Sequence, residues 1–298
     1  MKISPILLGL SLAAAGSLAA AAQDASAPTA PPKVIQIARE FIKPGRAGMA
    51  HDKTEAAFVA AMNRAKLQGH YVALNSLSGK SRALFITRYP SFAAWEADNK
   101  IVDKSPTISA EFDRDLMADG DLLQDFDQVV ETYDEELSYH PHPDISHARY
   151  YEISAFRVKP GHRKEWHELT KMVQDANEKG GTSAHWATYE IAYGADDGTY
   201  IILSADKSMA DIDQGFAESK KFAEALGGEE GMTKLDRLYG ETVESSRSEL
   251  FSINPKQSYA DEAWIKSDPD FWKPKATETA AAKAAAKPVA AAPKPSGR

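Results

Sequence analysis

Two histidines stand at matching places in two similar segments of the chain and are the first candidates for chemistry. His70 is followed by Tyr71, and His185 is followed by Trp186. An imidazole can bind a metal or haem iron, or transfer a proton near neutral pH. Each pair stands at the start of a segment rich in strand-forming residues. Because the two positions match, we expect the pairs to face two equivalent clefts between sheet and helices. The alternative is that each imidazole occupies a half-exposed strand end and has no chemical role.

The other groups of polar residues do not form a complete site. His140, His142 and His147 offer imidazole ligands for zinc or copper, but they lie in a proline-containing junction and no second cluster completes the coordination. The acidic stretch 113–127 does not have EF-hand spacing, because Met117 stands where an oxygen ligand is required. The sequence has no cysteine, no phosphate-binding loop and no serine-hydrolase motif. We therefore expect no metal and no cofactor.

The composition is that of a globular protein with an acidic surface. Of the 298 residues, 43% are hydrophobic and 26% are charged, which is enough to build a sizeable core. The chain has 35 Lys and Arg against 43 Asp and Glu. Such a surface repels nucleic-acid phosphates, so we expect no nucleic-acid partner.

The first 22 residues have the layout of a secretory signal peptide. Lys2 precedes an apolar run that starts at Ile6, and the segment closes on Ala20-Ala21-Ala22. The strongly apolar part is shorter than the roughly 20 residues that a membrane span requires. We expect cleavage after Ala22, a periplasmic or secreted location, and no transmembrane segment in the mature protein.

Two further segments have the composition of flexible chain. Residues 23–33 are rich in Pro, Ala and Ser, which favours a flexible spacer. Residues 275–298 are rich in Ala, Lys and Pro and contain too few large apolar groups to offset the entropy of ordering. We expect this end of the chain to be a disordered tail.

An internal repeat organises the rest of the chain. Residues 35–45 reappear as residues 151–161, and both copies are strand-like and end in Lys-Pro-Gly. Each copy continues with an apolar helical stripe, two strands joined by a glycine turn, a helical region opened by a capping serine, and a last strand. The predicted order is β-α-β-β-α-β over residues 34–143 and again over 144–260. Residues 261–274 form a C-terminal extension.

These elements predict an α+β fold with two tandem ferredoxin-like repeats. The ferredoxin-like order gives an antiparallel sheet with helices on one face only. The bare face of each sheet has to be covered, and the other copy is the economical cover. We therefore expect the repeats to pack sheet to sheet as a pseudo-dimeric α/β barrel, with no obligate protein partner.

The two Lys-Pro-Gly strand ends, with Ser-Phe-Ala-Ala-Trp-Glu at residues 91–96, resemble the dimeric α/β-barrel superfamily. Within it, residues 151–161 are similar to NIPSNAP-like domains, with antibiotic-biosynthesis monooxygenase domains as near relatives. The resemblance covers most of the chain from Val34 to about Tyr259. It implies the fold more strongly than an activity, because the superfamily includes cofactor-independent monooxygenases, haem-degrading enzymes and proteins without established chemistry.

Three functions follow from these observations. We expect a small apolar or aromatic ligand in a cleft between sheet and helices. The residues expected to line it are His70, Tyr71, Trp95, His185 and Trp186. Ile212 stands at the position equivalent to Trp95, so only the first copy can use that tryptophan. One alternative is a cofactor-independent monooxygenase or a haem-binding enzyme with His70 or His185 as axial ligand, and the second is a structural module without a ligand.

Overall fold

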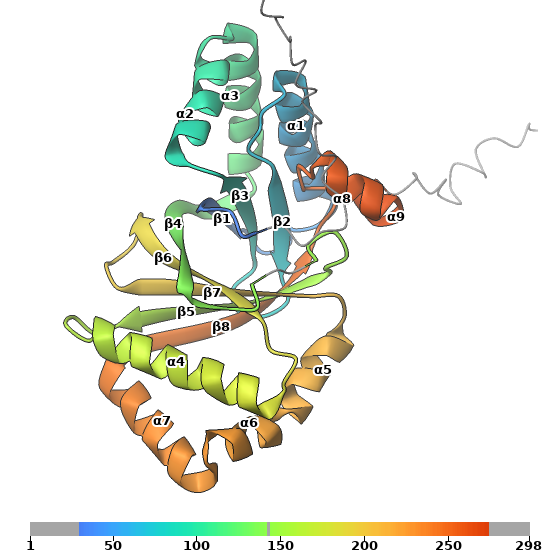
Figure 1. Cartoon of the computed structure of the whole chain (residues 1–298). Coiled ribbons are helices and arrows are strands. Elements are labelled where there is room, and N and C mark those ends of the chain that lie inside the picture. Colours follow the sequence, from blue (N-terminus) through green and yellow to red (C-terminus); the bar gives the residue numbers. More distant parts are fainter. Residues whose placement is uncertain (1–29, 142–143, 274–298) are drawn as a thin grey trace, which may run out of the picture.

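The computed structural model describes residues 30–141 and 144–273. The protein is α+β, and its strands form one closed antiparallel barrel with helices on the outside (Figure 1). None of the helices in these residues combines the length and the apolar character that crossing a membrane requires. The expected signal peptide, most of the spacer and the expected C-terminal tail lie outside the described residues.

The first half of the chain alternates strands and helices in the expected order, with its second helical region divided in two. Its elements are β1 (Val34–Ile42), α1 (Met49–Ala65), β2 (Tyr71–Ser76), β3 (Arg82–Tyr89), α2 (Phe92–Asp103), α3 (Pro106–Gly120) and β4 (Leu123–Tyr139). The helices of this half lie together on one side of the barrel (Figure 1).

The second half has the same alternation, with its second helical region divided in three. Its elements are β5 (Tyr150–Val158), α4 (Arg163–Gly180), β6 (Trp186–Tyr193), β7 (Thr199–Asp206), α5 (Met209–Ala217), α6 (Ser219–Leu226), α7 (Gly228–Thr242) and β8 (Val243–Ile253). These helices lie on the opposite side of the barrel from α1–α3 (Figure 1).

Local sequence explains where several of these elements begin and end. Gly45 and Gly161 follow β1 and β5 with φ of 77° and 85°, a backbone conformation that glycine adopts without strain. The Ser91 hydroxyl accepts a hydrogen bond from the Ala94 N–H and caps α2. Ser208 stands in the same place before α5. The turns and caps expected from the sequence are therefore present.

Hydrogen bonds between the two halves close the barrel, with strand order β1-β3-β2-β8-β5-β7-β6-β4. The 17-residue β4 pairs first with β1 and then with β6 of the other half. In return, β8 pairs with β5 and, through its last residues, with β2. The two sheets are therefore joined by hydrogen bonds along their edges, in addition to packing face to face. Without this pairing, the edge strands of each half would expose unpaired backbone groups.

Along each strand, the side chains point alternately into the barrel interior and outward under the helices. Ile35, Leu74 and Phe251 are among the buried residues of the interior. Outward residues of the first half pack under α1 and α3, and those of the second half pack around Trp166 of α4. The apolar groups of this barrel therefore form an inner core with an outer layer on each side.

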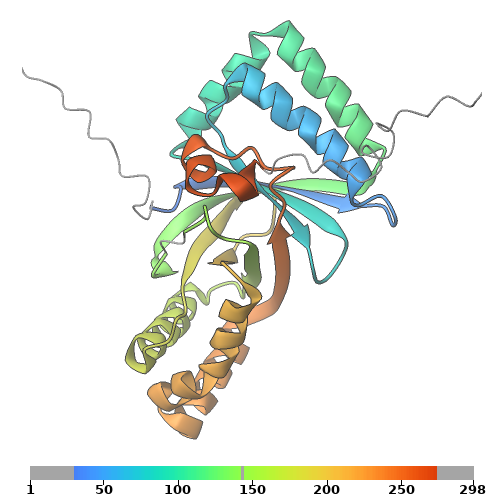
Figure 2. The ribbon, with the colours of Figure 1, turned by 90° about the vertical axis from the view of Figure 1, so that its right-hand side faces the viewer.

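The C-terminal extension forms two short helices, α8 (Glu262–Ser267) and α9 (Pro269–Trp272), which pack against the barrel on the side of α1 (Figure 2). Their Trp264 and Trp272 join the inner core, with ring centroids 5.2 Å apart. The Arg88 guanidinium of β3 lies 4.0 Å from the Trp264 ring and pairs with Asp261 at 2.7 Å. The extension is therefore an integral part of the folded unit.

A carboxyl group without a hydrogen-bond partner among the described residues lies on the inner face of the barrel. Glu131 of β4 is fully buried, and among the described residues neither of its oxygens has a hydrogen-bond partner. It shares the inner face of β4 with Val129 and Tyr133. Burial raises the pKa of Glu131 to about 8, and the positive charge of Arg39 only partly opposes this. The folded protein therefore holds a proton on Glu131 at pH values where the unfolded chain has lost it.

Stability should fall as the pH rises through the range between the unfolded and folded pKa of Glu131. The ordinary pKa of a glutamate is 4.5 and burial raises that of Glu131 to about 8, so the folded state binds more protons between these limits and ionisation destabilises it. The full effect is on the order of 5 kcal/mol. Denaturant unfolding at pH 5 and pH 8.5 should show this loss in the wild type and much less of it in Glu131→Gln. The exposed Glu230→Gln is the control, and equal pH dependence in all three proteins would contradict the assignment.

Candidate functional site

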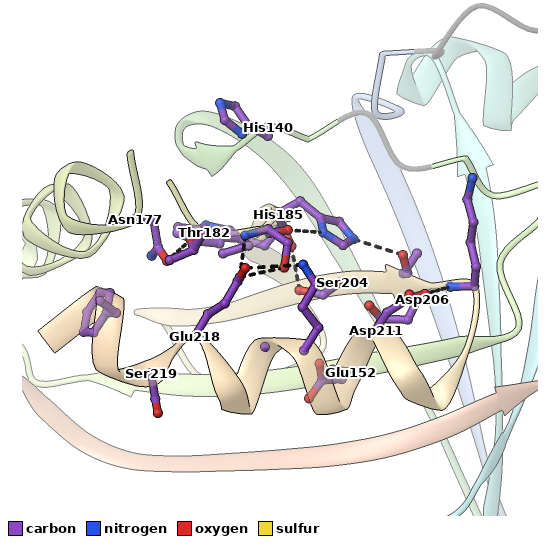
Figure 3. A pocket seen from close by; sticks show the side chains of 18 of the residues that line it. His140, Glu152, Asn177, Thr182, His185, Ser204, Asp206, Asp211, Glu218 and Ser219 are labelled. Carbon is purple, nitrogen blue, oxygen red and sulfur yellow. Dashed lines mark hydrogen bonds between the residues drawn. The ribbon is translucent and has the colours of Figure 1, made fainter. Parts of the chain in front are cut away.

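A cleft of about 710 Å³ lies between the outer face of the second-half strands and helices α4, α5 and α6 (Figure 3). The strands β5, β6 and β7 form its floor, and the helices form its walls. Its lining includes Glu152, Asn177, His185, Trp186, Asp206 and Glu218. His185 and Trp186, two of the five nominated residues, line this cleft.

The segment that enters β6 is held in place by side chains from two helices. Gly181 ends α4 in the left-handed conformation with φ of 59°. The Thr182 hydroxyl donates to the Asn177 side-chain oxygen at 2.7 Å. The Glu218 carboxylate accepts hydrogen bonds from the Ser183 N–H at 2.7 Å and from the Ser183 hydroxyl at 2.9 Å (Figure 3). These contacts fix the backbone that carries His185.

Both ring nitrogens of His185 face backbone carbonyl oxygens. Nδ1 lies 3.2 Å from the Ser183 oxygen, and Nε2 lies 3.0 Å from the Ala205 oxygen. A carbonyl only accepts hydrogen bonds, so the imidazolium satisfies both contacts and a neutral ring satisfies one. His185 therefore ties β6 to β7, and neither nitrogen is free to bind iron in this arrangement.

The cleft is more acidic than the apolar cleft that the sequence analysis expected. Asp211 accepts from the backbone N–H groups of Lys207 and Ser208 at the start of α5. Glu152 and Asp206 are different, because no basic side chain of the described residues forms an ion pair with either of them. One carboxylate oxygen of Asp206 is buried without a hydrogen-bond partner in this part of the chain.

Burial raises the pKa of both free carboxyl groups of the cleft. For Glu152 the negative charge of Asp206 adds to this, and for both groups the nearby His185 opposes it. Each carboxylate is therefore less stable here than in water. A ligand that brings a positive charge between Glu152 and Asp206 would restore part of the lost solvation.

Trp186 lines the cleft, and residues of β4 hold its side chain in place. Its indole Nε1–H donates to the Leu137 oxygen at 2.8 Å, and its ring lies 5.0 Å from that of Tyr139. The Thr188 hydroxyl donates to the same oxygen at 2.8 Å. Because these bonds orient the indole, Trp186 offers a rigid aromatic surface.

The other three nominated residues lie elsewhere. His70 stacks on Tyr259 at 4.3 Å, and its Nδ1 lies 3.2 Å from the Tyr259 oxygen. Burial lowers the pKa of His70. Tyr71 is buried against Phe85, at 5.6 Å between ring centroids. The first-half pair is therefore packed against a residue from the C-terminal part of the chain.

Trp95 belongs to a third place in the structure. Its ring stacks on Tyr89 at 5.8 Å and lies 6.4 Å from Phe92. It packs with the small apolar cluster of Val34 and Val130. Of the five nominated residues, the structure thus brings His185 and Trp186 into one cleft, places His70 and Tyr71 together elsewhere, and leaves Trp95 apart.

The sequence analysis missed a group of side chains that could hold a metal ion. Glu40, His51, Glu55 and Asp119 are all buried, and one ligand atom from each lies within 4.8 Å of the others. His51 and Glu55 are four residues apart on α1, a spacing that puts both on one helix face. Nothing in the sequence connects this pair with Glu40 or Asp119, so the cluster could not be found without the fold.

Comparison with known proteins identifies the fold. No family profile and no curated sequence matches this chain. Among solved structures, a "putative monooxygenase" from Fusobacterium nucleatum matches with a TM-score of 0.52 and 10% identity, over 76% of this chain and 94% of that one. The chain has the dimeric α/β-barrel fold.

Two further solved structures match this chain with lower scores. A "putative monooxygenase" from Lactobacillus acidophilus gives a TM-score of 0.44 and 8% identity, over 74% of this chain and 93% of that one. Chlorite dismutase from Candidatus Nitrospira defluvii gives 0.45 and 10%, over 79% and 95%. At such identities the likeness concerns the fold, so function has to be argued from the side chains of this α/β barrel.

Glu218 should be required for the order of the segment before β6. The hydrogen bonds from Ser183 lower the pKa of Glu218 to about 2, so the carboxylate is ionised at any ordinary pH. Replacing it with Ala in Glu218→Ala removes the acceptor and should speed backbone hydrogen exchange at Ser183 and the residues beside it. Glu224→Ala on α6 is the control, because among the described residues the only polar contact of the Glu224 side chain is the ion pair with Lys220, at 3.8 Å. Unchanged exchange in Glu218→Ala would contradict this role.

Proposed function

We propose that the protein binds a small molecule in the cleft beneath α4, α5 and α6, and that this ligand joins an aromatic or apolar body to a positive charge. The observation that carries the proposal is the pair Glu152 and Asp206, two partly desolvated carboxyl groups without a basic partner in the described chain, beside an aromatic wall. An organic amine has the chemistry that this pair would recognise.

The cleft supplies a separate surface for each part of such a ligand. Glu152 and Asp206 lie on the strand floor, Asp206 buried and Glu152 exposed, and an ammonium group between them would interact with both charges. Trp186 and Phe222 line the same cleft and would contact an apolar or aromatic body. This keeps the small aromatic ligand expected from the sequence and adds the charge that it must carry.

In this proposal His185 is a positioning residue. Its two ring nitrogens contact the Ser183 and Ala205 carbonyls, so it fixes the strand ends that present Asp206. The same contacts count against His185 as an axial haem ligand. The oxygenase and haem-binding alternatives have support from the shared fold only, and an absorbance spectrum of protein from the native host, with or without a Soret band, separates haem binding from the amine proposal.

We further propose that the two halves are tandem ferredoxin-like repeats of the NIPSNAP-like kind. The similar order of elements in the two halves and the repeated strand ending in Lys-Pro-Gly support this. The cross-pairing of β4 with β6 and of β8 with β2 supports a barrel that one chain completes without a partner. The first 22 residues support export to the periplasm or the medium.

Aromatic amines should bind the wild type more tightly than neutral aromatics of the same shape. Calorimetric titration with tryptamine and phenethylamine, against their hydroxyl analogues tryptophol and 2-phenylethanol, measures the contribution of the charge. The double variant Glu152→Gln/Asp206→Asn should lose at least about tenfold in amine affinity, which corresponds to about 1.4 kcal/mol. It should not gain affinity for the neutral compounds.

The control for this experiment is the double variant Glu229→Gln/Glu230→Gln, which replaces two exposed carboxyl groups on α7 away from the cleft lining. It removes the same two negative charges and should bind amines as the wild type does. If all the proteins bound amines equally, the attraction would be the general acidity of the surface. If none bound any probe, the cleft would not be an amine site.

Export can be tested on the protein from its native host. N-terminal sequencing of the extracytoplasmic fraction should give a chain that begins at Gln23, because cleavage is expected after Ala22. Replacing Ala20 and Ala22 with bulky residues should block processing while leaving the folded part unchanged. Recovery of the chain from outside the cytoplasm with Met1 intact would contradict the proposal.

A further inference from the structure

We propose that Glu40, His51, Glu55 and Asp119 bind one divalent first-row transition-metal ion, of the class of Mn²⁺, Fe²⁺ or Zn²⁺. The site lies in the half of the protein opposite the proposed ligand cleft, so it does not depend on that function. The sequence predicted no metal, because these four residues are spread over residues 40–119 and form no ligand motif in the chain.

The four side chains come from three elements that only the fold brings together. Glu40 is on the outward face of β1, His51 and Glu55 are in the first turns of α1, and Asp119 is in the last turn of α3. Helices α1 and α3 lie side by side over this part of the barrel (Figure 1, Figure 2). The cluster therefore sits where β1, α1 and α3 meet.

The distances fit ligands around one ion. From His51 Nε2, the nearest carboxylate oxygens of Glu40, Asp119 and Glu55 lie at 2.8, 3.6 and 3.8 Å. All four ligand atoms lie within 4.8 Å of one another. Nitrogen and oxygen ligands about 2.1 Å from a common ion are themselves about 3 to 4 Å apart, so an ion fits with small adjustments.

Burial and charge make the cluster unfavourable without a cation. The side chains of His51, Glu55, Asp119 and Glu40 are only 1%, 4%, 3% and 10% exposed. One oxygen of Glu55 is buried without any hydrogen-bond partner in the described chain and lies on the His51 side of the cluster. Throughout residues 30–141 and 144–273, His51 is the only basic group that pairs with these carboxylates. A divalent ion would supply the missing positive charge.

A second layer of polar groups orients the ligands. The Thr54 hydroxyl lies 2.6 Å from an Asp119 oxygen, and the Gln257 amide lies 3.0 Å from His51 Nδ1. Gln257 is buried and its amide oxygen has no partner among the described residues. As placed, the Gln257 NH2 group faces His51 Nδ1 and donates to Asp52 at 3.0 Å, so the ring proton lies on Nε2 and faces Glu40. Turning the amide would give up the bond to Asp52 and let its oxygen accept from Nδ1–H, which leaves Nε2 free for a metal.

The choice of metal class follows from the ligand types. One imidazole and three carboxylates suit Zn²⁺, Fe²⁺ and Mn²⁺, whereas Cu⁺ prefers sulfur and Ca²⁺ takes oxygen ligands only. Because all four ligands come from the protein and are buried, the ion would join α1 and α3 to β1. We assign it a structural role.

The second half of the chain does not repeat the cluster. When the Lys-Pro-Gly ends of β1 and β5 are aligned, Glu40 falls on Phe156 and Glu55 falls on Lys171, while His51 falls on another histidine. An apolar ring and a positive charge thus replace two ligands. The carboxylates are therefore not required by the fold itself, because the second half forms the same elements without them.

The competing explanation is a cluster that holds protons in place of a metal. Without an ion, burial and the charges of Glu40 and Asp119 raise the pKa of Glu55 to about 10, so the group would stay protonated at neutral pH. In that case Glu55→Gln would replace a neutral acid with a neutral amide. The variant would then be as stable as the wild type or more so, and metal ions would change neither protein.

The test measures metal directly. Full-length protein purified without chelators should contain close to one equivalent of a transition metal by inductively coupled plasma mass spectrometry. After removal of metal with EDTA and dialysis, titration with MnCl₂, ZnCl₂ or, under anaerobic conditions, FeSO₄ should restore one equivalent. The restored protein should unfold at a temperature higher by about 5 °C or more.

Variants connect the binding to these residues. Glu55→Gln and Asp119→Asn each remove one charged ligand and should weaken binding of the restoring ion at least about 100-fold. The cleft variant Glu152→Gln/Asp206→Asn is the control and should bind the metal as the wild type does. It also separates the two proposals, because amine binding and metal binding should be lost in different variants.

Two results would overturn the inference. The first is wild-type protein that binds none of the three ions stoichiometrically and shows no change in unfolding temperature, a result that does not depend on any variant folding. The second is Glu55→Gln that binds metal as tightly as the wild type. Glu55→Gln that is more stable than a metal-indifferent wild type would establish the proton-holding cluster instead.

Discussion

The pairing of β4 and β8 across the two halves is the constraint on which the rest of the structure depends. Each half alone is an antiparallel sheet with free edges and one uncovered face. Because β4 pairs with both β1 and β6, and β8 with both β5 and β2, the free edges become the two seams of one barrel. The apolar faces then point inward and the helices are confined to the outside.

Barrel closure also decides where polar chemistry can occur. Along each strand, alternate side chains point into the barrel or out under the helices. Glu40 on β1 points outward on the same face as Ala38 and Ile42 of the outer layer, and Glu152 on β5 points outward between Tyr151 and Ile153 of the inner core. Both proposed sites therefore lie between sheet and helices. Glu131 is an exception, a carboxyl on the inner face that the fold tolerates in its protonated form.

The two halves have similar strands and helices, but the space between sheet and helices differs. In the first half, α1 and α3 pack closely on the sheet and enclose the carboxylate–histidine cluster. In the second half, the helical region after β7 is divided into α5, α6 and α7, and a cleft remains between these helices, α4 and the sheet. The length and division of the helical region thus decide whether the outer layer is filled or hollow. The same strand order can support a buried site and an open one.

The sequence by itself determined the fold class, the order of strands and helices, and the turns and caps at their ends, because these depend on residues near one another in the chain. It also placed His185 and Trp186 at the start of a strand that lines a cleft. Only the tertiary structure decided which charges meet. Glu40 and Asp119 are far apart in sequence and come together through the packing of α3 and β1, and Glu152 meets Asp206 through the pairing of β5 with β7. The periodicity of a strand or helix determines the face on which a side chain lies, but the residues that it contacts depend on how elements distant in the sequence pack together.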